Sequence, residues 1–295
     1  MEETVPFCVG PLQEGWTLWD FLKAQGVSSS YIRKVKRAQP GITLRGEHKN
    51  TNERVHAGEV YELPLPQAEE TDVVGEDIPT QVVYESAFAI VFEKAAGMAV
   101  HPTLGYPSGT LANAAVGLFE KRGEKRPFRP VNRLDVGTSG LVLAAKNGLA
   151  APFLARSAVK EYMAMVTGEL PPGPGCIHAP IGRCADSIIR RRVSAEGKPS
   201  ETQYTVLAAA GGLSLIRCIP VTGRTHQIRV HFASIGHPLA GDGLYGTPHR
   251  QLRRHALHCS ALQFEEPDGY RALLRSPLPP DMAELAREKG LANNL

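Results

Sequence analysis

Residues 130 to 146, PVNRLDVGTSGLVLAAK, constrain the fold of this chain more than any other stretch. A loop that contains Gly137 and Gly140 opens into a continuous apolar run over 141–145. Glycine permits tight backbone geometry, and a short apolar run is typical of a buried strand. One carboxylate, that of Asp135, stands at the mouth of this predicted strand. It either caps a turn, as aspartate commonly does in loops, or takes part in chemistry.

The composition is that of an ordinary globular protein. The chain has 295 residues, which suits one large domain or two unequal ones. Its 42% of hydrophobic residues and 21% of charged residues argue against wholesale disorder. The net charge of +3 is too small to identify a nucleic-acid-binding protein, so local clusters of basic residues must decide that question.

The cysteines give no sign of a disulfide framework. The five cysteines are scattered without a C-x-x-C pair, which favours reduced thiols and disfavours metal ligation. The chain shows no signal-like opening segment and no apolar run of about 18 residues. We therefore expect a cytoplasmic protein that does not bind membranes, and a monomer as the default state.

Residues 1–66 predict a small α/β unit with two short helices and short strands. The second helix carries a basic cluster that is able to neutralise phosphates, although such charges are also found on merely solvated surfaces. Arg33, Lys34 and Arg37 are its candidate RNA contacts. Residues 67–80 are Pro-rich and acidic, as linkers are, so that residues 81–295 form the larger domain.

Several further patterns follow the linker in order. They are KAAGMAVHP at 94–102, KEYMAMVTG at 160–168, RRRV at 190–193 with GKPSETQYTVL at 197–207, VTGRTHQIRVHFA at 221–233, and LHCSALQF at 257–264. Together with residues 130–146, they resemble the motifs of the RluA-type pseudouridine synthases, whose central motif has the form H-R-L-D-x-x-T-S-G-L. Asn132 replaces the usual histidine and cannot titrate near neutral pH, so we assign it no acid or base role.

The resemblance implies an α+β fold. Such enzymes have a mixed, largely antiparallel sheet with a central active-site cleft, and many carry a small N-terminal RNA-binding domain. It also implies the isomerisation of specific uridines to pseudouridine in structured ribosomal or transfer RNA. That reaction has no redox step and no energy input, so we expect no cofactor.

The same resemblance assigns roles to individual residues. Asp135 would be the nucleophile, Tyr162 would stack on the flipped base, and Arg224 would pair with Asp135 and hold its charge. Arg133 would brace the space that the base leaves. The remaining candidate RNA contacts are Arg191, Arg192 and Arg229.

Two other classes of function compete with this one. A retaining glycosidase also uses carboxylates at a sugar carbon, but it needs a second acid, and Asp242 stands in a different loop with a turn-like setting. A non-catalytic RNA-binding or ribosome-assembly protein would retain the fold without the reaction. A metal site is not expected, because His226 and His231 are five positions apart and do not share a helix face.

Overall fold

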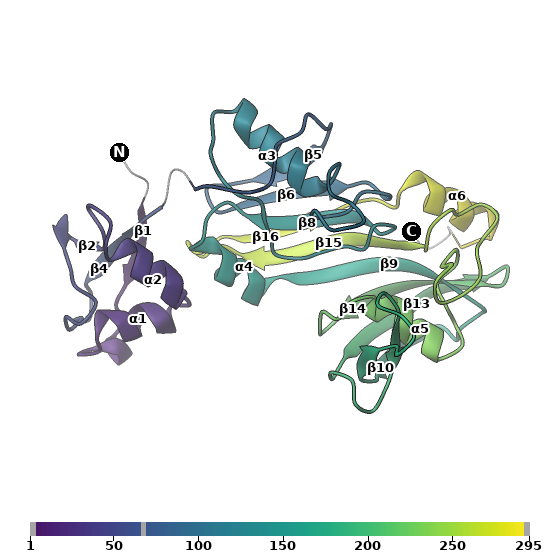
Figure 1. The fold of residues 1–295 in the computed structure, drawn as a ribbon. Coiled ribbons are helices and arrows are strands. Elements are labelled where there is room, and N and C mark those ends of the chain that lie inside the picture. The colour runs from purple at the N-terminus through teal and green to yellow at the C-terminus, as the bar shows by residue number, and fades with distance from the viewer. Residues whose placement is uncertain (1–3, 66–68, 292–295) are drawn as a thin grey trace.

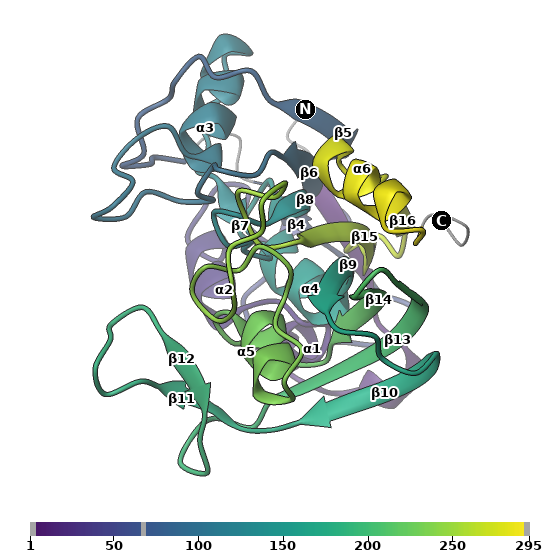
Figure 2. The same cartoon turned by 90° about the vertical axis from the view of Figure 1, so that its right-hand side faces the viewer.

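The structure is a computed structural model, which describes residues 4–65 and 69–291. A small unit at the N-terminal end lies beside a larger unit built on one long sheet (Figure 1). Seen from the side, helices α5 (Gln227–Ser234) and α6 (Pro280–Glu288) lie on different sides of this sheet (Figure 2). A two-stranded hairpin, β11–β12, stands away from it.

The N-terminal unit has a four-stranded antiparallel sheet in the order β1-β4-β2-β3 and two helices. Thr17 and Ser28 cap these helices by accepting hydrogen bonds from backbone amides of the first turn. The first helix buries Leu18, Phe21 and Leu22, as their spacing predicts. The elements are β1 (Thr4–Cys8), the 3-10 helix η1 (Pro11–Gln13), α1 (Leu18–Ala24), α2 (Ser29–Val35), β2 (Thr43–Leu44), β3 (Glu47–His48) and β4 (Val60–Pro64).

The larger unit confirms the predicted mixed, largely antiparallel sheet. Eight strands follow the order β10-β13-β14-β9-β15-β8-β6-β5, while β7 pairs with β8 and β16 with β15. Within the described residues, β8 and β15 form the single parallel pair of this sheet. The strands are β5 (Gln81–Glu85), β6 (Ala89–Lys94), β7 (Arg129–Pro130), β8 (Ser139–Ala145), β9 (Val159–Thr167), β10 (Gly173–His178), β13 (Glu201–Ala210), β14 (Leu213–Pro220), β15 (Leu257–Glu265) and β16 (Arg271–Arg275).

Helices cover both faces of this sheet. The side chains of α6 pack with Met163 and Leu215 in one apolar cluster, while Phe232 of α5 packs edge-on against Tyr204 of β13, with ring centroids 5.1 Å apart. Thr110 caps the helix that its position predicts. The elements not yet given are α3 (Leu111–Lys121), α4 (Ala150–Ser157), β11 (Ile181–Arg183) and β12 (Arg191–Val193).

The two units are in direct contact. The Phe7 ring of β1 lies 6.3 Å from the Phe153 ring of α4, and Glu69 forms ion pairs of 2.6 Å with both Lys34 and Arg129. One cluster of buried apolar side chains includes residues of both units. The division of the chain at residues 66 and 81 therefore stays a prediction.

Strand β8 is the centre of the fold, as the sequence predicts. All seven of its residues are buried, between the antiparallel partner β6 and the parallel partner β15. Gly140 makes this approach possible, because its φ of +108° lies in the region that favours glycine. A Cβ atom at this position would lie 2.3 Å from the carbonyl oxygen of Cys259.

We expect Gly140→Ala to destabilise the protein by more than about 2 kcal/mol, because it adds a backbone clash to the unfavourable φ. Gly269→Ala is the matched control, since its φ is also positive but the space around it is open. The control should lose about 1 kcal/mol of folding stability, which is the cost of the unfavourable φ alone. Denaturant unfolding of both variants measures the difference, and equal losses would contradict the close approach.

Candidate active site

Asp135 lies in the loop that leads from β7 into β8. Its side chain is 26% exposed, so the carboxylate faces an accessible space. Asn132 in the same loop is buried, and its amide group donates to the Leu141 carbonyl at 3.1 Å and accepts from the Leu143 amide at 2.8 Å. The side chain of Asn132 thus binds the backbone of β8, which agrees with giving it no acid or base role.

The partner of Asp135 is Arg229, and the predicted pairing with Arg224 is wrong. Nη1 of Arg229 lies 3.0 Å from Oδ2 of Asp135. Arg224 is exposed, and its guanidinium donates instead to the Pro199 carbonyl at 3.3 Å. Arg224 belongs to the loop before α5, whereas Arg229 lies within α5 and its guanidinium reaches the carboxylate of Asp135.

The same finding removes Arg229 from the candidate phosphate contacts. Its side chain is only 8% exposed, and it also donates to both carboxylate oxygens of Asp242, from Nε at 2.7 Å and from Nη2 at 2.9 Å. Burial raises the pKa of Asp242, but hydrogen bonding and the charge of Arg229 outweigh this and leave that pKa below its ordinary value. Asp242 is therefore an ionised anchor that fixes the guanidinium in front of Asp135.

Tyr162 extends the site into the sheet. It lies on β9 between Cys218 of β14 and Cys259 of β15, which are its partners in register. Burial, together with the charge of Asp135, raises the pKa of the Tyr162 phenol well above its ordinary value. The hydroxyl of Tyr162 therefore keeps its proton at neutral pH.

Two buried histidines hold the Thr-Ser segment after Asp135. Nε2 of His255 lies 2.8 Å from the Thr138 hydroxyl, and Nδ1 of His258 lies 3.0 Å from the Ser139 hydroxyl. Burial lowers the pKa of each histidine to about 4, so both are neutral near pH 7. Arg254 adds a 3.0 Å hydrogen bond to the Gly137 carbonyl while it pairs with an aspartate of α6.

Lys94 supports the loop from the other side. This buried residue donates from Nζ to the carbonyls of Ala95 and Met98 at 2.8 Å and of Val136 at 3.4 Å. Burial lowers the pKa of Lys94 to about 7, although the charge of Asp135 acts in the opposite direction. This lysine therefore holds the segment that follows β6 against the loop of Asp135 through backbone carbonyls.

Sequence reasoning missed two further residues of the site. His226 begins α5 with a left-handed φ of 57°, and its Nε2 lies 3.8 Å from Oδ2 of Asp135. The Tyr245 hydroxyl lies 2.8 Å from Nδ1 of His226. Both residues stand in the matched patterns, but their sequence separation of 19 gives no sign of this contact.

The other predicted RNA contacts lie on the surface. Arg133 and Arg192 are exposed, whereas Arg191 is half-buried and donates to backbone carbonyls of its own hairpin. In the N-terminal unit, Arg37 is exposed and Lys34 is engaged with Glu69. The guanidinium of Arg33 lies 6.0 Å from the Trp19 ring centroid.

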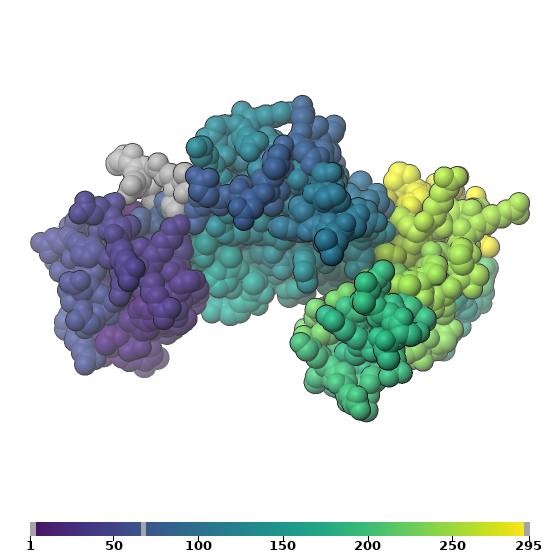
Figure 3. Space-filling view, in the orientation of Figure 1, coloured from purple at the N-terminus to yellow at the C-terminus, as the bar shows by residue number. Residues whose placement is uncertain are grey.

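The ion pair between Asp135 and Arg229 connects two parts of the larger unit. Asp135 precedes the central strand β8, and Arg229 belongs to α5. The molecular surface is hollowed between the part coloured blue to teal and the part coloured green (Figure 3). Among the described residues, no group of histidine, cysteine and acidic side chains is suited to hold a metal ion. None of the described helices is long and apolar enough to cross a membrane.

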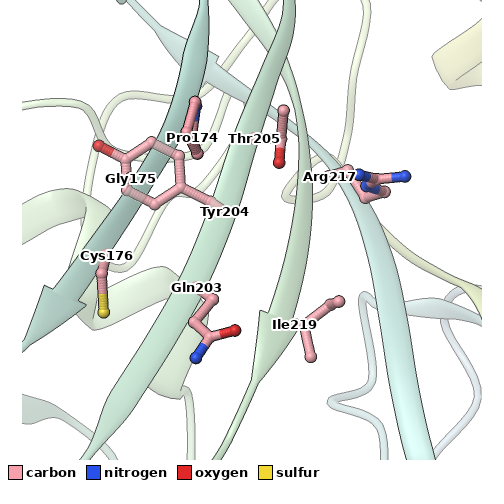
Figure 4. Close-up of a pocket in the computed structure, with 8 residues that line it drawn as sticks. All are labelled: Pro174, Gly175, Cys176, Gln203, Tyr204, Thr205, Arg217 and Ile219. Carbon is pink, nitrogen blue, oxygen red and sulfur yellow. The ribbon is translucent and has the colours of Figure 1, made fainter.

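A separate hollow of about 460 Å³ lies on strands β10, β13 and β14 (Figure 4). In register, its residues Thr205 and Arg217 pair with each other, and Arg217 pairs with Met163 rather than with Tyr162. Because neighbouring residues of a strand point to opposite faces, this hollow lies on the face of the sheet away from Tyr162. It is not part of the Asp135 site.

Comparison with known proteins identifies the family. Residues 89–234 match the family model described as RNA pseudouridylate synthase. The chain is 32% identical over 279 residues to the RNA pseudouridine synthase YjbO of Bacillus subtilis, with 92% of this chain and 98% of that protein covered. The chain belongs to the RNA pseudouridine synthase family. The family assignment from the sequence motifs is therefore confirmed.

Other relatives agree with this assignment. The chain is 38% identical over 263 residues to ribosomal large subunit pseudouridine synthase D of Nitrosomonas europaea, covering 84% of this chain and 76% of that protein. The structure of human RNA pseudouridylate synthase domain containing 1 superposes with a TM-score of 0.56 at 27% identity, over 70% of this chain and 88% of that one. RNA pseudouridine synthases are isomerases that act on uridine in RNA, and this protein is an enzyme of that class.

Substitutions of the two arginines in residues 221–233, Arg224 and Arg229, should differ in their effect on folding stability. Arg229→Met leaves Asp242 buried without its partner, and we expect it to cost about 3–5 kcal/mol of folding stability. Arg224→Met is the matched control, and should stay within about 0.5 kcal/mol of the wild type, because this side chain is exposed. Denaturant unfolding tests both, and similar losses would contradict the buried pairing.

Stability should also fall as the pH is lowered from about 6.5 to about 4. In that window the unfolded chain binds a proton at His258 while the folded protein does not. Above the window both forms are neutral at this residue, and below it both are protonated. One buried histidine with this shift contributes about 3 kcal/mol to the difference.

The test is to compare unfolding midpoints at both ends of the window. His258→Gln should reduce the loss of stability on acidification. His178→Gln is the control, because that side chain is largely exposed and lies outside the site. A pH dependence in His258→Gln equal to that of the control would show that His258 does not carry the effect.

Proposed function

We propose that this enzyme converts specific uridines of structured RNA to pseudouridine with Asp135 as its nucleophile. The observation that carries the proposal is the difference between the two carboxylates on Arg229. Asp135 is 26% exposed and able to meet a substrate, whereas Asp242 is 1% exposed and occupied on both oxygens. The buried guanidinium fixes the orientation of the reactive carboxylate through a 3.0 Å hydrogen bond.

The reaction begins with a uridine that leaves its stack, at a cost of a few kcal/mol that is lowest in loops and bulges. The base enters between the Asp135 loop and β9, where the aromatic ring of Tyr162 offers a stacking surface. Asp135 then attacks as a nucleophile, or stabilises charge, while the bond between the uracil nitrogen and the ribose carbon breaks. The base turns, a carbon–carbon bond forms to the ribose, and any bond to Asp135 breaks. The newly bonded ring carbon loses its proton and the freed ring nitrogen gains one, so the product is an isomer of the substrate.

A glycosidase reaction is disfavoured by the state of the second carboxylate. Retaining and inverting glycosidases both need a carboxylic acid that is protonated when it meets the leaving group. Asp242 is ionised and shielded by Arg229, so it offers neither the proton nor access. Tyr162 is a protonated group of the site, because burial raises its pKa and the charge of Asp135 acts in the same direction.

The RNA would be held by basic residues around the site. Arg133 directly precedes the catalytic loop, and Arg192 lies on the β11–β12 hairpin, both exposed to solvent. The N-terminal unit, whose Phe7 packs against Phe153 of α4, supplies Arg33 of α2 and Arg37 of the turn that follows this helix. Ribosomal and transfer RNA of the cytoplasm are the substrate classes, and the names of several relatives favour large-subunit ribosomal RNA.

Asp135→Asn should abolish the activity while RNA binding and folding persist, because Arg229 keeps its bidentate partner Asp242. The first measurement is a transcriptome-wide map of pseudouridine in cells that lack the protein. Sites that vanish should return with the wild type but not with Asp135→Asn. Asp268→Asn, in an exposed turn, is the matched control and should restore every site.

Two results would contradict the proposal. If Asp135→Asn restored the sites, Asp135 would not be the nucleophile. A complete map of ribosomal and transfer RNA without any lost site would favour an RNA-binding role for the retained fold.

A further inference from the structure

The β11–β12 hairpin touches the active site through one hydroxyl group. At its base the hairpin is joined to the rest of the protein by the backbone bridge between Ile181 and Lys198, with 3.0 Å hydrogen bonds. Further out, the backbone amide of Arg191 donates to the Tyr245 hydroxyl at 2.9 Å. The tip extends into solvent, where Ile188 is 89% exposed.

Tyr245 also contacts both groups that face Asp135. Its hydroxyl lies 2.8 Å from Nδ1 of His226, and its ring centroid lies 5.0 Å from the guanidinium carbon of Arg229. The backbone amide of Tyr245 donates to Asp242 at 3.3 Å, which fixes the residue from below. One side chain therefore meets the hairpin, the histidine and the arginine of the site.

The donors and acceptors of these contacts favour one tautomer of His226. A backbone amide can only donate, so the Tyr245 oxygen accepts from Arg191. The hydroxyl proton of Tyr245 is then free to be donated to Nδ1 of His226. This leaves the imidazole proton on Nε2, the nitrogen that lies 3.8 Å from Oδ2 of Asp135. A negative carboxylate favours a donor on the nitrogen that faces it.

We propose that Tyr245 is a positioning residue, which couples the placement of the β11–β12 hairpin to the hydrogen-bond donors around Asp135. RNA that contacts the exposed hairpin holds Arg191 in place, Arg191 orients the Tyr245 hydroxyl, and this hydroxyl keeps the His226 proton on Nε2. A shift of less than 1 Å closes the 3.8 Å gap to a hydrogen bond. The coupling rests on the proposed role of Asp135, whereas the tautomer does not depend on it.

The tautomer is measurable without RNA. In histidine-labelled protein, nitrogen NMR should show the His226 proton on Nε2, with the signals assigned by their loss in His226→Gln. Tyr245→Phe removes the hydroxyl but keeps the ring beside Arg229, and should move the proton toward Nδ1. Tyr270→Phe is the matched control, because that ring lies 55% exposed and outside the site. A proton on Nδ1 in the wild type, or an unchanged tautomer in Tyr245→Phe, would overturn the assignment.

Kinetics test the coupling on an RNA identified by the pseudouridine map. Tyr245→Phe should lower kcat about tenfold, as the loss of one hydrogen bond predicts, while KM changes less than about twofold. Arg191→Pro removes the amide donor and should give a similar loss of kcat. The double variant should lose little more than either single one, since both cut the same link.

The coupling would be overturned if the losses of kcat added up in the double variant, or if the variants changed KM alone. These outcomes differ from failure of the proposed function, in which the wild type produces no pseudouridine and Asp135→Asn changes nothing. The NMR result stands in that case as well. Folding of each variant is checked by its unfolding midpoint, and Tyr245→Phe alone decides the matter if Arg191→Pro does not fold.

Discussion

The ion pairs of Arg229 are the interaction on which the catalytic region depends. A buried guanidinium joins the loop of Asp135 to Asp242 and so connects the two halves of the long sheet. Burying these charges is costly unless each finds a partner, and the bidentate geometry supplies the partners. Both oxygens of Asp242 are occupied, whereas the side chain of Asp135 is 26% exposed, so Asp135 is the carboxylate that meets the substrate in our proposal.

The sheet provides the rigid frame for this arrangement. Its central strands bring Tyr162 of β9 beside the parallel pair of β8 and β15, and Gly140 allows that pair to approach. The hydroxyls of Thr138 and Ser139 then bind neutral histidines beneath the loop. In our proposal Asp135 is a positioned nucleophile, and these short contacts hold the geometry of its loop when a nucleotide enters.

The hairpin and the N-terminal unit serve a different purpose from the core. They carry exposed basic residues, which in our proposal contact the phosphates of a folded RNA. Tyr245 connects the hairpin to the catalytic groups, so RNA contact and alignment of the site are not independent in our proposal. The hollow on the opposite face of β13 and β14 has no part in this arrangement.

The sequence by itself determined the main elements and the family, because periodicity, capping residues and ordered motifs are local properties of the chain. The roles of Asp135 and Tyr162 stay predictions from those motifs. The buried strand at residues 139–145 and the helix after Thr110 were predictable for that reason. Only the tertiary structure decided between Arg224 and Arg229, and only it revealed Tyr245 and the role of Asp242. Those choices depend on the direction in which a helix aims its side chains across a gap of about a hundred residues, and no local pattern records that direction.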